Sequence, residues 1–260
     1  MEDWEKTSVD LFESYVNTFS GLTEEQQKNF AIKKEHSKRV ANNSKKLAEM
    51  LNLEPEETKL AVIIALFHDI GRFKQLVKYD TFNDTVSEDH AEMAVEILKE
   101  KSYLNELSSE EQKIAFTAIG LHNKLELPKK LDEQELMQAR ILRDADKLDI
   151  LKVLSDYYTD KSQIPNHTLT WELPKATQVS PGVVKDVIGG KLVSKNEVKS
   201  EMDVKIMQLS WVYDINFKSS IELIFQNRYL EKIYSSLPKN DTVIEIYRKI
   251  KVYAENKLLE

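Results

Sequence analysis

The chain has 260 residues, of which 41% are hydrophobic, and it carries a net charge of −7. This length is enough for one sizeable core, and the negative charge argues against a broad surface that binds nucleic-acid backbones. The sequence contains no cysteine, which excludes disulfides, zinc–thiolate sites, iron–sulfur clusters and cysteine nucleophiles. Any bound metal must therefore be held by nitrogen and oxygen ligands.

The N-terminal stretch has the composition of a soluble protein. Its residues MEDWEKTSVDLF place acids where a secretory signal would carry basic and apolar segments. No apolar run reaches the length of about 18 residues that a membrane-spanning helix needs. We therefore expect a cytoplasmic protein with no membrane partner.

Apolar residues recur at helical spacing along most of the chain, and glycine and proline are scarce, with six of each. The pattern predicts helices over these approximate ranges: 7–19, 32–51, 87–101, 109–121 and 132–158. Another helix is predicted to begin at Pro55 and end at Gly71, which places His68 and Asp69 in its last turn. The fold class we expect is all-α, a bundle of helices.

The segment 161–200 interrupts this periodicity. It contains these helix-breaking residues: Pro165, Pro174, Pro181, Gly189 and Gly190. We interpret it as an insertion, and both a short helix over 181–187 and a small hairpin remain open for it. After residue 200, two or three helices are predicted, and we expect them to pack on the outside of the bundle. The expected organisation is a first domain, an insertion and a C-terminal helical extension, at 1–160, 161–200 and 201–260.

Four of the five histidines fall on apolar faces of predicted helices: His36, His68, His90 and His122. A single buried histidine is more often a hydrogen-bonded core residue than a metal ligand. Four in one bundle would leave many polar ring atoms to satisfy, and a shared metal satisfies them together. The fifth, His167, lies in the stretch IPNHTLTW and matches no motif, so we interpret it as a surface-loop residue.

Carboxylates that could complete a ligand set occur in the run ILRDADKLDIL, at Asp144, Asp146 and Asp149. Helical periodicity does not choose among them, and an ordinary acidic helix surface also accounts for the run when it is taken alone. Histidine and carboxylate ligands together suit iron, manganese, zinc, cobalt or nickel.

The stretches HSKRVANNSKKLA, ALFHDIGRF and ILRDADKLD supply, in order, a lone histidine, an adjacent His–Asp pair and a distant aspartate. This order resembles the HD-domain family of metal-dependent phosphohydrolases, over about residues 30–155. The resemblance implies an HD-domain helical bundle whose metal is held by His36, His68, Asp69 and Asp146. Asp146 is preferred to Asp144 because the family's ligand directly precedes a basic residue, here Lys147. Asp69 and Lys147 are the expected catalytic residues, and Asp69 would orient water or bridge two ions.

Family members with two metals, including the HD-GYP cyclic-dinucleotide phosphodiesterases, add histidines between the His–Asp pair and the last aspartate. His90 and His122 occupy that interval here, which implies that they are ligands of a second ion. Around a single ion, the same two histidines would instead support the ligands or contact the substrate. The GYP tripeptide is absent, and this argues against a cyclic dinucleotide as substrate.

The resemblance implies a phosphohydrolase that uses one or two divalent transition-metal ions (Mn, Fe, Ni, Co or Zn) to cleave a small phosphate ester, most simply a nucleotide. Such ions lower the pKa of bound water from about 15.7 toward roughly 7 to 9. The expected substrate contacts are basic residues beside predicted ligands: Arg72, Lys124 and Lys147. An HD-domain diiron oxygenase and a regulatory module without catalysis remain open, as does the oligomeric state.

Overall fold

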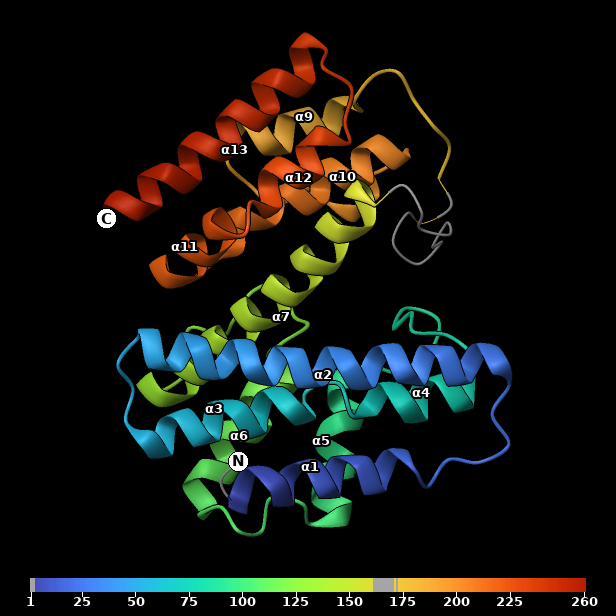
Figure 1. The fold of residues 1–260 in the computed structure, drawn as a ribbon, viewed down its shortest axis with the longest axis vertical. Helices are drawn as coiled ribbons and strands as arrows, with labels where there is room; N and C mark the ends of the chain where they lie inside the picture. Colours follow the sequence, from blue (N-terminus) through green and yellow to red (C-terminus); the bar gives the residue numbers. More distant parts are fainter. Residues whose placement is uncertain (1–2, 161–170, 172) are drawn as a thin grey trace. The chain divides into compact units, whose positions relative to one another are not determined.

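The structure is a computed structural model that describes residues 3–160, 171 and 173–260. Over these residues, all of the regular secondary structure is helical and there is no strand (Figure 1). The prediction of an all-α fold is confirmed. His167, which we assigned to a surface loop, lies outside the described residues. None of the described helices is both long enough and apolar enough to cross a bilayer.

The chain divides into two compact units, Met1–Asp146 and Lys147–Glu260. The helices that begin in the first unit are α1 (Asp3–Val16), α2 (Glu24–Met50), α3 (Pro55–Phe67), α4 (Gly71–Tyr79), α5 (His90–Lys101), α6 (Ser109–Leu121) and α7 (Glu133–Thr159). Helix α7 continues into the second unit. The expectation that the C-terminal helices pack on the HD-like bundle stays a prediction.

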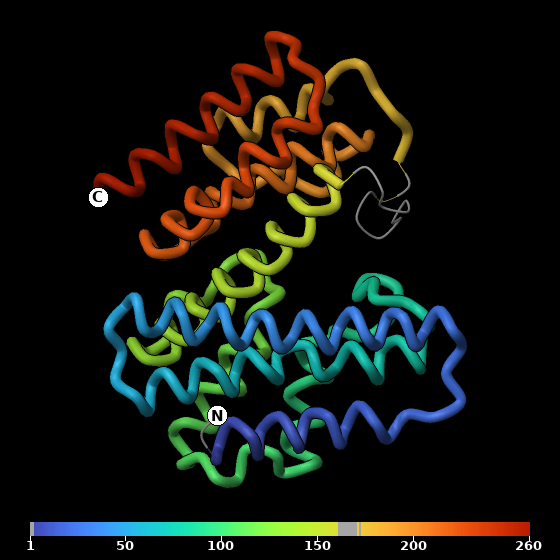
Figure 2. Tube along the Cα trace, in the orientation of Figure 1, coloured from blue at the N-terminus to red at the C-terminus, as the bar shows by residue number. Residues whose placement is uncertain are grey.

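In the first unit, the long helix α2 runs alongside α3 and α4 (Figure 2). Helices α4, α5 and α6 pack in succession, and α3 contacts both α1 and α6. Edge-on ring contacts join Phe12 to Phe67 and Phe73, and Phe73 also meets Phe30. These four rings are buried, so they fix α1, α2, α3 and α4 against one another without any polar group to satisfy.

The connection between α3 and α4 differs from the sequence prediction. Helix α3 ends at Phe67, one residue before the His–Asp pair, and Gly71 begins α4 instead of ending α3. A Cβ at Gly71 would lie 2.2 Å from the backbone oxygen of His90 and 2.8 Å from the backbone nitrogen of Ala94. The glycine is needed here because it lets α4 and α5 approach closely. It does not end α3, so the prediction was wrong.

The second unit contains α9 (Pro181–Ile188), η1 (Lys195–Glu197), α10 (Glu201–Ser210), η2 (Trp211–Asp214), α11 (Lys218–Gln226), α12 (Tyr229–Ser235) and α13 (Asp241–Leu259). Of the two alternatives for the insertion, the structure shows the short helix, and residues 173–200 contain no strand. More α-helices follow residue 200 than the two or three predicted. One reason is Arg228, whose φ of 56° separates α11 from α12 where the apolar pattern runs on.

Candidate metal centre

The six side chains predicted as metal ligands lie close together in the first unit. They come from α2, the α3–α4 turn, the start of α5, the end of α6 and α7, in the order His36, His68, Asp69, His90, His122 and Asp146. All four imidazoles are buried, as is Asp69. Separate helices thus converge on a cluster that is polar but almost closed to solvent.

Asp69 lies between two pairs of histidines. Its Oδ2 is 3.6 Å from Nε2 of both His36 and His68. Its Oδ1 is 3.4 Å from Nε2 of His90 and 3.8 Å from Nε2 of His122. We call His36, His68 and Asp146 the first half-site, and His90 and His122 the second half-site. Each half-site faces a different oxygen of the same carboxylate.

The first half-site presents buried polar atoms that its neighbours leave unpaired. Oδ1 of Asp146 lies 3.2 Å from Nε2 of His36, without hydrogen-bond geometry. Among the described residues, neither this oxygen nor Nε2 of His68 has a hydrogen-bond partner. Nδ1 of His68 donates to the carbonyl oxygen of Ala65 at 2.7 Å, so its Nε2 carries a lone pair that is directed into the cluster. This nitrogen and oxygen set fits a divalent transition metal.

The second half-site brings two ring nitrogens into contact. Nδ1 of His122 donates to the carbonyl oxygen of Ile119, and Nδ1 of His90 lies 2.7 Å from Oδ2 of Asp84. Nε2 of His90 and Nε2 of His122 are 3.0 Å apart. Because two lone pairs repel at this distance, a proton or a metal cation must lie between them. The second half-site therefore also fits a cation.

Burial sets the charge of two of the imidazoles. It lowers the pKa of His68, and together with the neighbouring His90 and His68 it lowers the pKa of His122 to about 3. Both rings are therefore neutral near pH 7, which is the form that binds metals. They would coordinate an ion without first losing a proton.

The two carboxylates stay ionised in spite of their burial. Burial alone would raise the pKa of Asp69, but Lys33, His68 and Arg72 together hold it well below its usual range. Burial also works to raise the pKa of Asp146, but the neighbouring His36 and His68 together outweigh it, so the pKa is lowered. The cluster thus offers negative oxygens beside the neutral rings of His68 and His122.

The depressed pKa of His122 makes the stability of the metal-free protein depend on pH. The unfolded chain takes up this proton near pH 6.5, and the folded chain only near pH 3. Stability is therefore lost as the pH falls below the unfolded value, because the unfolded state then binds more protons. Between about pH 7.5 and 5.5 we expect this residue to cost roughly 1 kcal/mol of unfolding free energy. Urea unfolding in the presence of a chelator should show a smaller loss in His122→Asn; an identical loss would contradict the assignment.

The predicted substrate-binding cations have partners within the protein. Nη1 of Arg72 donates to the carbonyl oxygen of Phe82 and to Oδ1 of Asp84, so it holds the loop before α5. Lys124 pairs with Asp89, and Lys147 pairs with Asp214 at 2.7 Å. Arg72 also lies next to a predicted ligand, since its Nε is 3.5 Å from Oδ1 of Asp69. Their contacts with substrate stay predictions.

Sequence reasoning missed two residues that touch the cluster. Lys33 places its Nζ 2.7 Å from Oδ2 of Asp69, and Asp84 accepts the Nδ1 hydrogen of His90. Lys33 lies three residues before His36 on the same helix, so the shared face was a usable signal. Asp84 lies in a loop and had no signal in the local sequence.

The acidic run in α7 is not an ordinary helix surface. Asp144 and Asp149 are almost fully buried, so that interpretation is wrong. Asp146 has a more exposed side chain, but its Oδ1 is inaccessible and lies 3.2 Å from Nε2 of His36. One oxygen of Asp146 lies with ring nitrogens of His36 and His68 within 4.8 Å of one another. The structure therefore brings Asp146 to the histidines.

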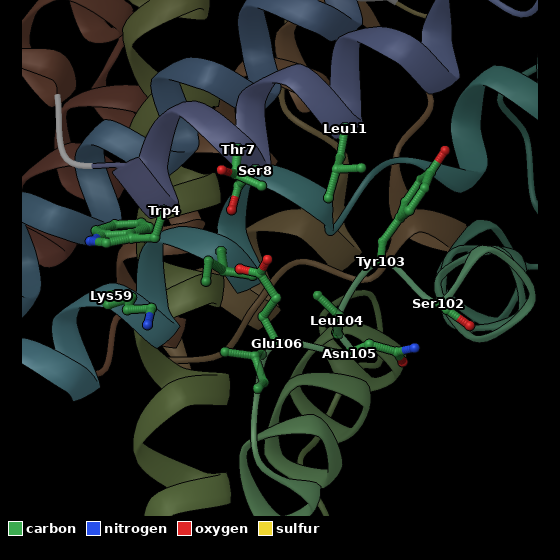
Figure 3. A pocket seen from close by; sticks show the side chains of 12 residues that line it. Trp4, Thr7, Ser8, Leu11, Lys59, Ser102, Tyr103, Leu104, Asn105 and Glu106 are labelled. Atoms are coloured by element: carbon green, nitrogen blue, oxygen red, sulfur yellow. The ribbon is translucent and has the colours of Figure 1, made fainter.

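Two cavities lie beside α1 and away from the histidines. One, of about 300 Å³, is lined by Thr7, Ser8 and Leu11 of α1 together with Lys59 and the segment 102–107 (Figure 3). The other, of about 280 Å³, lies between α1, α2 and α3. Neither is lined by a candidate ligand.

Comparison with protein families agrees with the geometry of the cluster. Residues 34–151 match the model of the family described as HD domain. The chain contains an HD domain. The matched range includes all six clustered residues, and the HD family consists mostly of metal-dependent phosphohydrolases. No curated protein and no solved structure shows significant similarity to the chain.

The two half-sites of the HD domain predict how many metal ions each chain binds. Protein loaded with Mn²⁺ or Co²⁺ should hold close to two ions per chain, and His90→Ala should lower this toward one because it removes a ligand from one half-site only. Asp84→Asn should weaken the binding of the same ion about ten- to a hundredfold, since the His90 ring loses its carboxylate partner. Elemental analysis after dialysis measures both. Full stoichiometry in both His90→Ala and His122→Ala would restrict the site to the four ligands around the His–Asp pair.

Proposed function

We propose that the protein is a metal-dependent phosphohydrolase that cleaves a small phosphate ester, most simply a nucleotide. The observation that carries the proposal is the position of Asp69, whose two oxygens each face a different pair of buried histidines. A carboxylate in this position can bridge two ions, and paired ions are a recurrent device for displacement at phosphorus. The HD family match supports the same reaction class.

The residues have distinct roles in this proposal. His36, His68, Asp69 and Asp146 would hold one ion, and His90, His122 and the other oxygen of Asp69 would hold the second. A bound divalent ion supplies the Lewis acidity that activates water and neutralises phosphate oxygens. Asp69 fixes the spacing of the two half-sites, and the neutral rings of His68 and His122 are available as ligands at physiological pH.

The test is a phosphate-release screen on protein reconstituted separately with Mn²⁺, Fe²⁺, Co²⁺, Ni²⁺ or Zn²⁺. Nucleoside mono-, tri- and cyclic phosphates are the first substrates, and a chelator-treated sample is the control. Release that depends on metal supports the proposal. No release from any ester with any of these metals would overturn it.

A diiron oxygenase is the second candidate, because the six clustered residues would suit two iron ions as well. Oxygen consumption by the iron-loaded protein, measured beside phosphate release, separates the two functions. Metal binding without turnover in either assay would favour a regulatory HD module.

A further inference from the structure

Lys33 contacts the buried cluster and is also partly exposed to solvent. It lies on α2, one turn before His36, and its Nζ is 2.7 Å from Oδ2 of Asp69. Its side chain is 21% exposed, whereas that of Asp69 is 4% exposed. Lys33 is therefore the more solvent-accessible member of this ion pair.

Metal binding would leave the charge of Lys33 without a counter-charge. In the structure, Lys33 pairs with Asp69, and the nearby Arg72 pairs with Asp84. One divalent ion would balance the two carboxylates Asp69 and Asp146, and a second ion would add two more positive charges. The ammonium group would then face an excess of positive charge in a site almost closed to water, and this is costly without an anion.

The surroundings hold Lys33 in place at the edge of the centre. Its Nζ lies 5.6 Å from the ring centroid of Phe82, and the guanidinium carbon of Arg72 lies 5.8 Å from the same ring. Nη1 of Arg72 also donates to the backbone oxygen of Phe82. The ring of Phe82 thus lies within cation–π distance of both the Lys33 ammonium group and the Arg72 guanidinium group.

We propose that Lys33 binds the phosphoryl group of the substrate, an inference that rests on the proposed phosphohydrolase activity. On metal loading, the ammonium group exchanges its contact with Asp69 for a contact with a phosphate oxygen. Lys33 thereby supplies the charge-assisted hydrogen bond that orients the phosphate at the centre.

Binding of inorganic phosphate to the Mn²⁺-loaded protein tests this role without any turnover. Calorimetry should show that Lys33→Gln weakens phosphate binding about ten- to a hundredfold, because one hydrogen bond to a charged group is lost. Lys33→Arg should restore most of the affinity. The matched control is Lys34→Gln, since Lys34 is the next residue on α2 but pairs with Glu13, and it should bind phosphate like the unmodified protein.

The manganese content of each variant separates a phosphate contact from support of Asp69. Two ions in Lys33→Gln together with weakened phosphate binding supports the proposal. Loss of metal in that variant, unchanged phosphate affinity, or no phosphate binding by the unmodified protein would each overturn it. If no ester is hydrolysed but phosphate binding still depends on Lys33, the proposed function fails and the anion site stands.

Discussion

Replacing Asp69 with alanine is expected to remove both the bound metal and phosphate release while the helical fold survives. Both oxygens of this carboxylate face ring nitrogens, so the substitution takes a ligand from each half-site at once. Loss of residues that only support ligands costs about ten- to a hundredfold, and loss of a shared ligand should exceed a hundredfold. The bundle is held by apolar contacts such as those of Phe12 and Phe67, which the substitution does not touch.

Elemental analysis, phosphate release and circular dichroism on the same sample check this result. Asp146→Ala should behave similarly at the first half-site, whereas Asp156→Ala is a matched control on α7 because its exposed carboxylate pairs with Lys152. Full turnover in Asp69→Ala would end the hydrolase proposal. Loss of metal in Asp144→Ala but not in Asp146→Ala would show that the wrong aspartate has been chosen.

Gly71→Ala is expected to destabilise the protein by about 3 kcal/mol or more, although alanine is normally the better helix former. The new methyl group would meet the backbone oxygen of His90 at 2.2 Å and the backbone nitrogen of Ala94 at 2.8 Å. Backbone atoms cannot turn aside as a flexible side chain can, so α4 and α5 would have to separate. His90 opens α5, so the second half-site should lose its ion as well.

Gly120→Ala provides the control for this prediction. Its added Cβ would meet Cγ2 of Val95 at 3.6 Å, which is an ordinary contact. This substitution should therefore be neutral or stabilise by up to about 1 kcal/mol through helix propensity. Urea unfolding of both variants measures the contrast. Equal stability of the two would show that the α4–α5 approach is looser than the structure indicates.

The helices could be predicted largely from periodicity, and the exception shows the limit of that signal. The predicted ranges 109–121 and 132–158 agree with α6 and α7 to within about a residue. Helix α4 was missed because Gly71 follows an apolar run and so has the local appearance of a helix end. Its actual role depends on His90, which is distant in sequence, and no local pattern contains that contact.

Some residues of the candidate site could also be predicted from the sequence, and others could not. The four histidines were predicted from their places on apolar helix faces, and Asp69 and Asp146 from the order of the three motifs. Lys33 and Asp84 were not found, because lysines and aspartates are common on helical surfaces and in loops. Their distances to Asp69 and His90 distinguish them from solvated charges, and for Lys33 the helix face that it shares with His36 was a further signal.

The histidine rings differ in the hydrogen-bond partners that hold them, and these partners differ in how easily a substitution removes them. His68 and His122 each donate to a carbonyl of the main chain, from Ala65 and Ile119, and no side-chain substitution removes a carbonyl. His90 depends instead on the side chain of Asp84, in a surface loop where replacements accumulate readily. A single replacement of Asp84 would therefore loosen His90 and weaken the second half-site, while the main-chain anchors of His68 and His122 stay in place.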